Sequence, residues 1–178
     1  MKKDLEKILI GKDKLQTRIE ELGKEISRDY KDKNPILICI LKGAVLFLSD
    51  LMKNISVPLE IDFLSLSSYG NSTKSSGIVK IRKDIEADIF GRHVIVVEDI
   101  VDSGLTLEYI MDYLNKHKPL SVKTCTLLDK PNAHKIAIKI DYVGFEVSNE
   151  FVVGYGLDFA EKYRNLPYIG ILKKEIYS

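Results

Sequence analysis

Apolar residues in this chain form short continuous runs, and most runs are followed by a segment of helical spacing. Residues 36–41 and 94–97 are almost wholly aliphatic, which is typical of strands buried on both faces of a parallel sheet. Residues 44–55 and 105–116 follow them with apolar side chains three and four positions apart, which predicts helices. Residues 122–128 predict a further buried strand. The pattern therefore indicates right-handed β–α crossovers in an open parallel sheet.

The segments outside these strand–helix units follow other patterns. Residues 12–30 carry an apolar face at helical spacing and predict a first helix. Residues 57–67 alternate, so we expect a strand near a sheet edge whose wetter face carries Glu60 and Asp62. Residues 78–83 predict its return strand.

Two stretches lack a clear period. The Ser/Gly/Thr-rich residues 67–77 form a long loop of the kind that serves as a lid over a site or is disordered. After Lys139 the apolar pieces are short and interrupted by glycines. We expect this last part of the chain to build a small subdomain over one edge of the sheet and not to extend the sheet.

Composition narrows the function classes. The 178 residues are 45% hydrophobic and 30% charged, with a formal net charge of +1, so no global field recruits nucleic acid or an anionic membrane. No apolar run approaches the length of a membrane span, and acidic residues close to the first methionine argue against a signal peptide. Cys39 and Cys125 lie inside apolar runs and predict buried thiols in a reducing compartment. We expect a single cytoplasmic domain.

Candidate chemistry gathers where the run at 94–97 ends. Glu98 and Asp99 follow it directly, and Asp102 precedes a small-residue segment that leads into the helix predicted over 105–116. Backbone N–H groups at such a helix start can bind a phosphate, which the three acids would repel. A ligand with both hydroxyls and phosphate, such as a phosphorylated sugar, satisfies both features. The alternative is an ordinary helix cap made by Asp102 or Ser103, which leaves Glu98 and Asp99 unexplained.

Residues 94–106 resemble the 5-phosphoribosyl 1-pyrophosphate motif of type I phosphoribosyltransferases. Further motifs follow the order found in the hypoxanthine-guanine phosphoribosyltransferases: Leu41-Lys42-Gly43, Ser68-Tyr69-Gly70, Leu127-Leu128-Asp129-Lys130, Phe151-Val152-Val153-Gly154-Tyr155, and Leu157-Asp158 with Arg164 six residues on. The resemblance spans roughly residues 8–172. It implies a Rossmann-like parallel α/β sheet flanked by helices, with a core over about 30–140. It also implies a small hood subdomain from about 1–12 and 141–178 and a flexible β-arm lid at 67–77.

The resemblance also implies a reaction. It is the transfer of a 5-phosphoribosyl group from 5-phosphoribosyl 1-pyrophosphate to N9 of hypoxanthine or guanine, giving IMP or GMP and pyrophosphate in purine salvage. Asp102 is implied as the catalytic general base, beside N7 of the purine. The expected cofactor is Mg²⁺, and the expected assembly is a homodimer or homotetramer, without nucleic acid or membrane as a partner.

Each ligand group is assigned residues by the same resemblance. The 5′-phosphate is expected at Asp102, Ser103, Gly104, Leu105 and Thr106, and the ribose at Glu98 and Asp99. Pyrophosphate is expected at Lys42, Gly43, Ser68, Tyr69 and Arg164, with the peptide before Lys42 able to adopt the cis form. The purine is expected at Lys130, Phe151, Val152 and Asp158, where Lys130 would select a 6-oxo over a 6-amino group. Mg²⁺ is expected at Glu98, Asp99 and Asp158.

Plainer interpretations stay open beside these roles. Lys42 and Lys130 could be solvated lysines at strand ends, Phe151 could be a core residue, and Asp158 and Arg164 could form a surface ion pair. Two rival functions also remain. One is a regulatory member of the same superfamily that binds RNA. The other is a receiver-type signalling domain whose acidic pair binds Mg²⁺.

Overall fold

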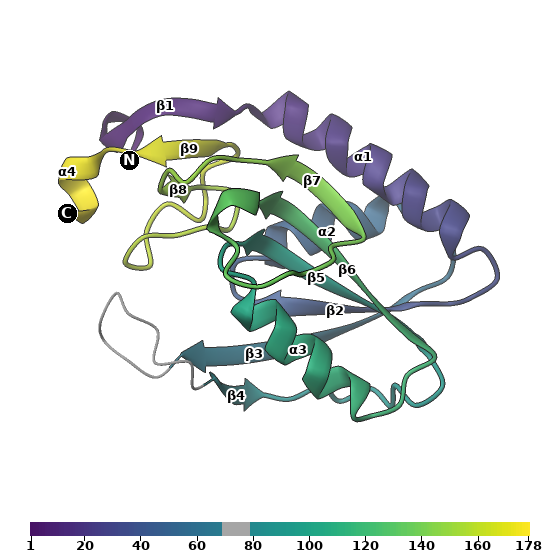
Figure 1. Ribbon diagram of the computed structural model, residues 1–178. Helices are drawn as coiled ribbons and strands as arrows, with labels where there is room; N and C mark the ends of the chain where they lie inside the picture. Colours follow the sequence, from purple (N-terminus) through teal and green to yellow (C-terminus); the bar gives the residue numbers. More distant parts are fainter. Residues whose placement is uncertain (69–78) are drawn as a thin grey trace.

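The computed structural model describes residues 1–68 and 79–178 (Figure 1). Its elements in chain order are η1 (Lys2–Asp4), β1 (Leu5–Ile10), α1 (Lys12–Asp29), β2 (Ile36–Leu41), α2 (Val45–Lys53), β3 (Glu60–Ser68), β4 (Val79–Lys83), β5 (His93–Val101), α3 (Leu105–Asn115), β6 (Ser121–Asp129), η2 (Pro131–Ala133), β7 (Tyr142–Glu146), β8 (Val152–Val153), β9 (Ile169–Leu172) and α4 (Lys174–Tyr177).

The central sheet has six strands in the order β4-β3-β2-β5-β6-β7. Every neighbouring pair is parallel except β3 and β4, which pair antiparallel. The predicted buried strands, the two crossover helices and the return strand are therefore confirmed. Because β2, β5 and β6 run the same way, their carboxyl ends meet at one edge, where open α/β sheets bind ligands.

The continuous aliphatic runs have their explanation in two packed layers. In β2, Leu37 and Cys39 belong to the core shared with α1 and α2, whereas Ile36 and Ile38 belong to the core shared with α3. Figure 1 shows α1 and α2 on one face of the sheet and α3 on the other. A strand with helices on both faces needs apolar residues at every position. Cys39 and Cys125 are buried free thiols, as predicted.

The expectation that the chain after Lys139 would not extend the sheet is wrong for β7, which pairs in parallel with β6. The glycine that suggested an interruption permits this pairing, because a Cβ on Gly144 would lie 2.4 Å from the carbonyl oxygen of Leu127. The guanidinium of Arg18, on α1, donates hydrogen bonds to the carbonyl oxygens of Val143 and Gly144. These bonds give two backbone carbonyl groups of the edge strand β7 a hydrogen-bond partner.

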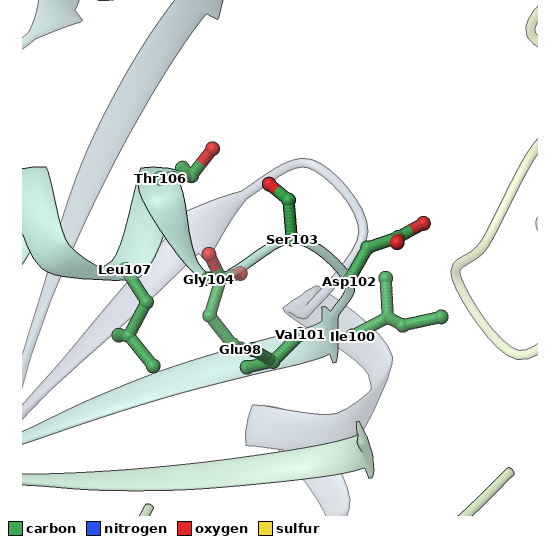
Figure 2. Close-up of a pocket in the computed structure, with 8 residues that line it drawn as sticks. All are labelled: Glu98, Ile100, Val101, Asp102, Ser103, Gly104, Thr106 and Leu107. Atoms are coloured by element: carbon green, nitrogen blue, oxygen red, sulfur yellow. The ribbon is translucent and has the colours of Figure 1, made fainter. Parts of the chain in front are cut away.

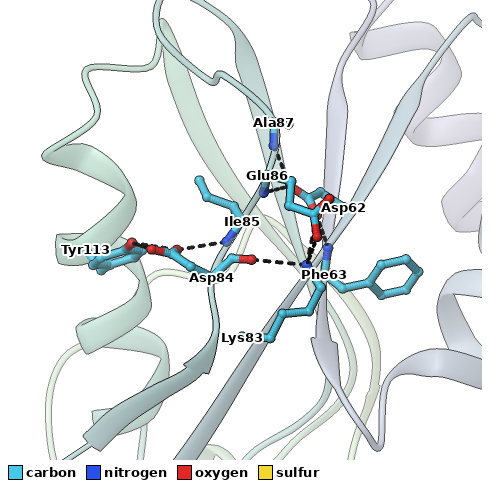
Figure 3. Close-up of polar contacts among 8 residues, drawn as sticks. All are labelled: Asp62, Phe63, Lys83, Asp84, Ile85, Glu86, Ala87 and Tyr113. Atoms are coloured by element: carbon cyan, nitrogen blue, oxygen red, sulfur yellow. Dashed lines mark hydrogen bonds and ion pairs between the residues drawn. The ribbon is translucent and has the colours of Figure 1, made fainter.

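The predicted wetter face of β3 is also wrong. Asp62 is only 7% exposed, whereas Ile61 on the other face is 43% exposed. The Asp62 carboxylate accepts backbone N–H groups from Phe63, Glu86 and Ala87 at 2.7–2.8 Å (Figure 3). Burial alone would raise the pKa of Asp62, but these three bonds, together with the charge of Lys83, outweigh it and lower the pKa. Asp62 thus fastens the connection between β4 and β5 to β3.

Both ends of the chain build a second sheet, in the order β1-β9-β8. It encloses its own apolar cluster, which includes Leu5, Val153, Tyr163, Leu166 and Leu172. Figure 1 shows this sheet beside the carboxyl ends of the parallel strands, with the two termini close together. Within the described residues, we find no helix with the length and apolar character needed to cross a membrane.

Candidate active site

The turn between β5 and α3 forms the first part of the site. Gly104 directly precedes α3 with a left-handed φ of +83°, and no side chain caps this helix. The alternative in which Asp102 or Ser103 serves as the helix cap is therefore wrong. A hollow of about 400 Å³ opens here, lined by Glu98, Ile100, Val101, Asp102, Ser103, Gly104, Thr106 and Leu107 (Figure 2). The first turn of a helix offers N–H groups without intrahelical partners, so this hollow suits an anion.

The acidic pair lies at the carboxyl end of β5, inside the molecule. The Glu98 side chain is 8% exposed, and Asp99 accepts the backbone N–H of Ile100 at 2.9 Å. Burial, followed by the charge of Asp99, raises the pKa of Glu98 well above its usual range. Burial also raises the pKa of Asp99 to about 6, against the opposing effects of the Ile100 N–H and the Arg164 charge. Two ionised carboxylates are therefore unfavourable here unless further positive charge is bound.

The loop after β2 packs directly against this pair. The peptide bond between Leu41 and Lys42 is cis. A Cβ on Gly43 would lie 1.6 Å from Asp99 Oδ2, and a Cβ on Gly156 would lie 2.0 Å from the carbonyl oxygen of Gly43. Glycine at these two positions lets three backbone segments meet around one carboxylate.

A second hollow, of about 770 Å³, lies between this loop and the segment that connects β8 to β9. It is lined by Ile40, Leu41, Lys42, Gly43, Leu66, Glu98, Asp99, Thr106, Asp158 and Arg164. The structure thus brings Lys42, Gly43 and Arg164 together with the acidic pair. Ser68 is the last residue of β3, whereas Tyr69 and the predicted lid from residue 69 onward lie outside the described residues.

The two cations of this hollow share a carboxylate that the sequence did not single out. Glu161 contacts Lys42 Nζ at 3.0 Å and Arg164 Nη2 at 3.2 Å. Arg164 also contacts Asp158 at 2.8 Å and donates to the carbonyl oxygen of Gly156. Asp158 and Arg164 do form an ion pair, but they do so facing the hollow. Nothing in the spacing of residues 158–164 distinguishes Glu161 from a solvated glutamate.

The third hollow, of about 460 Å³, is lined by Ile100, Asp102, Lys130, Phe151, Val152, Leu157 and Asp158. It contains all four residues expected to bind the purine. Lys130 is only 8% exposed, and its Nζ lies 3.5 Å from Asp102 Oδ2, so it is not a solvated lysine. Sequence reasoning missed Ile100 and Leu157, because an apolar residue at a strand end is not distinguishable from core.

The three hollows share walls. Glu98 and Thr106 line the first and second, Asp158 lines the second and third, and Ile100 and Asp102 line the first and third. One extended ligand can therefore reach the hollow at the start of α3, the acidic pair and the hollow at Phe151 in contiguous space.

The residues expected to hold Mg²⁺ fit a hydrated cation. Across the described ranges, no three carboxylate, imidazole or thiolate groups lie close enough to form a ready-made ligand set. Mg²⁺ usually binds one or two carboxylates and keeps several waters. Glu98 and Asp99 offer that arrangement, with raised pKa values that a positive charge would lower.

The family model described as "Phosphoribosyl transferase domain" matches residues 11–160. The chain belongs to this family. The receiver-type alternative is therefore wrong, and the phosphoribosyltransferase resemblance is confirmed.

Relatives of this phosphoribosyltransferase match its sequence over nearly the whole of its length. It is 54% identical to the hypoxanthine-guanine phosphoribosyltransferase of Bacillus subtilis, over 99% of this chain and 98% of the relative. It is 57% identical to the bifunctional protein TilS/HprT of Listeria innocua, of which it spans 28%. A crystal structure of a hypoxanthine phosphoribosyltransferase from Staphylococcus aureus superposes with a TM-score of 0.96 at 46% identity, covering 100% of this chain and 97% of that chain. The type I phosphoribosyltransferase fold is thereby confirmed.

Proposed function

We propose that this protein transfers the 5-phosphoribosyl group from 5-phosphoribosyl 1-pyrophosphate to N9 of hypoxanthine or guanine. The products are IMP or GMP and pyrophosphate, and the physiological role is purine salvage. The full-length similarity to enzymes named for this reaction supports the substrate class. We also propose that the chain assembles with copies of itself into a homodimer or homotetramer.

One observation carries it. The three hollows share walls, so the phosphate, pyrophosphate and purine groups of donor and acceptor could lie in contiguous space. The 5′-phosphate would lie in the hollow at the start of α3, on backbone N–H groups and the hydroxyls of Ser103 and Thr106. The ribose would lie over Glu98 and Asp99. Pyrophosphate and purine would then extend in the two remaining directions.

The pyrophosphate hollow would stabilise the leaving group. Lys42 and Arg164 would donate to its oxygens, and Mg²⁺, when bound, supplies further positive charge there. The peptide at Lys42 and Gly43 would hold these oxygens close to the acidic pair. Asp158 would face both Mg²⁺ and the purine, since it lines both hollows.

The purine hollow would select and activate the acceptor. Phe151 and Ile100 offer apolar surface for a flat ring, Lys130 would donate to the 6-oxo group, and Val152 would contribute backbone hydrogen bonds. Asp102 would take a proton from N7 as N9 attacks the anomeric carbon. Its side chain is 63% exposed and contacts Lys130, so it is accessible from this hollow.

The test is nucleotide formation from the donor with Mg²⁺ and hypoxanthine, guanine, xanthine or adenine in turn. We expect IMP and GMP, little product from adenine, and loss of product when the divalent cation is chelated. Asp102→Asn should keep donor binding and lower kcat by about 10²- to 10⁴-fold. Product from no purine, or RNA binding without transfer, would refute the proposal, and normal turnover of Asp102→Asn would refute the general base.

A further inference from the structure

The ring of Phe151 is held on two sides. The Tyr177 ring stacks on it with centroids 4.7 Å apart and planes inclined by 24°. The Phe159 ring meets it edge to face, at 5.6 Å and 88°. Both geometries are favourable for aromatic pairs. The Phe151 side chain is therefore fixed by two other rings before any ligand binds.

Tyr177 contacts Phe151 outside the set of residues that line the purine hollow. Phe151 lines that hollow together with Ile100 and Leu157, and Tyr177 is not among the described residues that line it. An aromatic ring has two faces, and Tyr177 stacks on one of them. A flat ligand that stacks on Phe151 in this hollow would therefore use the other face.

The position of Tyr177 depends on the second sheet and not on the parallel sheet. The backbone N–H of Leu172 donates to the carbonyl oxygen of Phe151 at 2.8 Å, and that of Lys173 donates to the backbone carbonyl oxygen of Asp4 at 3.0 Å. Ile176 packs against the apolar cluster of the second sheet. These contacts fasten α4 to both the start of the chain and the backbone of Phe151.

We infer that Tyr177, on α4, is a positioning residue for purine binding that acts through Phe151. This inference rests on the proposed function, because it assigns the free face of Phe151 to the purine. A ring fixed in advance loses no rotational freedom when the purine stacks on it, and this raises affinity for the purine alone. Phe151 lines neither of the two hollows assigned to the donor's phosphates, so the donor would not contact this ring.

The variants Tyr177→Ala, Tyr177→Leu and Tyr177→Phe test it by steady-state kinetics with each substrate varied in turn. We expect Tyr177→Ala to raise the KM for hypoxanthine about three- to tenfold, with the KM for the donor and kcat within twofold of wild type. Tyr177→Phe should keep the wild-type KM for hypoxanthine, because the stacking requires the ring and not the hydroxyl. Tyr177→Leu should not, because it keeps apolar bulk without a ring.

Two controls separate this role from loosening of the C-terminal helix. Lys174→Ala changes an exposed residue of α4 and should leave both KM values unchanged. The unfolding midpoint of each variant in urea reports any global loss of stability. An unchanged purine KM in Tyr177→Ala, an equal rise in the donor KM, or full rescue by leucine would overturn the inference. Absence of turnover with any purine in the wild type would instead refute the proposed function first.

Discussion

A single methyl group on Gly43 should disable the donor site while leaving the fold in place. The added Cβ would lie 1.6 Å from Asp99 Oδ2, whereas ordinary contact begins at 3.4 Å, so the oxygen must retreat by the difference, about 1.8 Å. The backbone of Gly43 is not left-handed, so alanine brings no conformational penalty there. The substitution should therefore change only the position of the Asp99 carboxylate.

Displacement of this size has a known cost in enzymes. A misplacement of about 1 Å can lower the rate about 10²-fold, which corresponds to about 2.7 kcal/mol of transition-state stabilisation. We therefore expect Gly43→Ala to lower kcat/KM for the donor about 100-fold. Initial rates at saturating hypoxanthine and Mg²⁺, with the donor varied, measure it.

Two further proteins locate the cause. Gly11→Ala is the matched control, since a Cβ at Gly11 meets nothing within 4 Å and its φ is −73°. It should behave as wild type. In an Asp99→Ala background the methyl group has no carboxylate to displace, so Gly43→Ala should add less than about a threefold loss. Equal losses in both backgrounds, or donor kinetics within threefold of wild type for Gly43→Ala alone, would refute the reasoning.

Three other changes test the site. Lys130→Ala should lose about tenfold or more in hypoxanthine affinity, because a buried donor is removed. Exposed Lys135→Ala should not, and equal binding by the two variants would contradict the contact. Asp99 has a pKa raised to about 6 from an ordinary 3.8, so its proton stabilises the ligand-free fold, and this contribution is lost as the pH rises through about 6. Asp99→Asn should therefore gain stability relative to wild type between pH 4 and 7 in urea titrations without divalent cations, and a constant gap would count against the raised pKa. Glu161→Gln should lower the donor KM by about two- to fivefold, because its carboxylate no longer competes for Lys42 and Arg164, and exposed ion pairs are worth about 1 kcal/mol or less. A higher donor KM in this variant would show that Glu161 assists binding.

The central strands and crossover helices were predictable because burial on both faces imposes a continuous aliphatic run, which few other structures share. β7 was not predictable, because Gly144 is equally typical of a broken strand and of a close approach to Leu127. The burial of Asp62 was missed for a related reason. An acid in an alternating strand usually faces solvent, and its partners Glu86 and Ala87 lie 24 and 25 residues away.

Some residues of the candidate site were likewise predictable from the sequence, and others were not. Glu98, Asp99 and Asp102 were found from local chemistry, because three acids beside an anion loop need an explanation. Lys130 and Phe151 came from the family resemblance, since a lone lysine or phenylalanine carries no local signal. Ile100 and Leu157 were missed because they contribute apolar surface, which the sequence does not distinguish from core. Glu161 was missed because its pairing with Lys42 depends on the folded loop after β2.

The three bonds to Asp62 have a mechanical consequence. The connection between β4 and β5 belongs to no strand, yet the amides of Glu86 and Ala87 are bonded as tightly as those of a sheet. The hydroxyl of Tyr113, on α3, also donates to Asp84 in the same connection (Figure 3). Slow hydrogen exchange should therefore extend through this irregular segment. The segment is tied to both β3 and α3, so we expect it to keep a fixed position beside the sheet although it belongs to no strand.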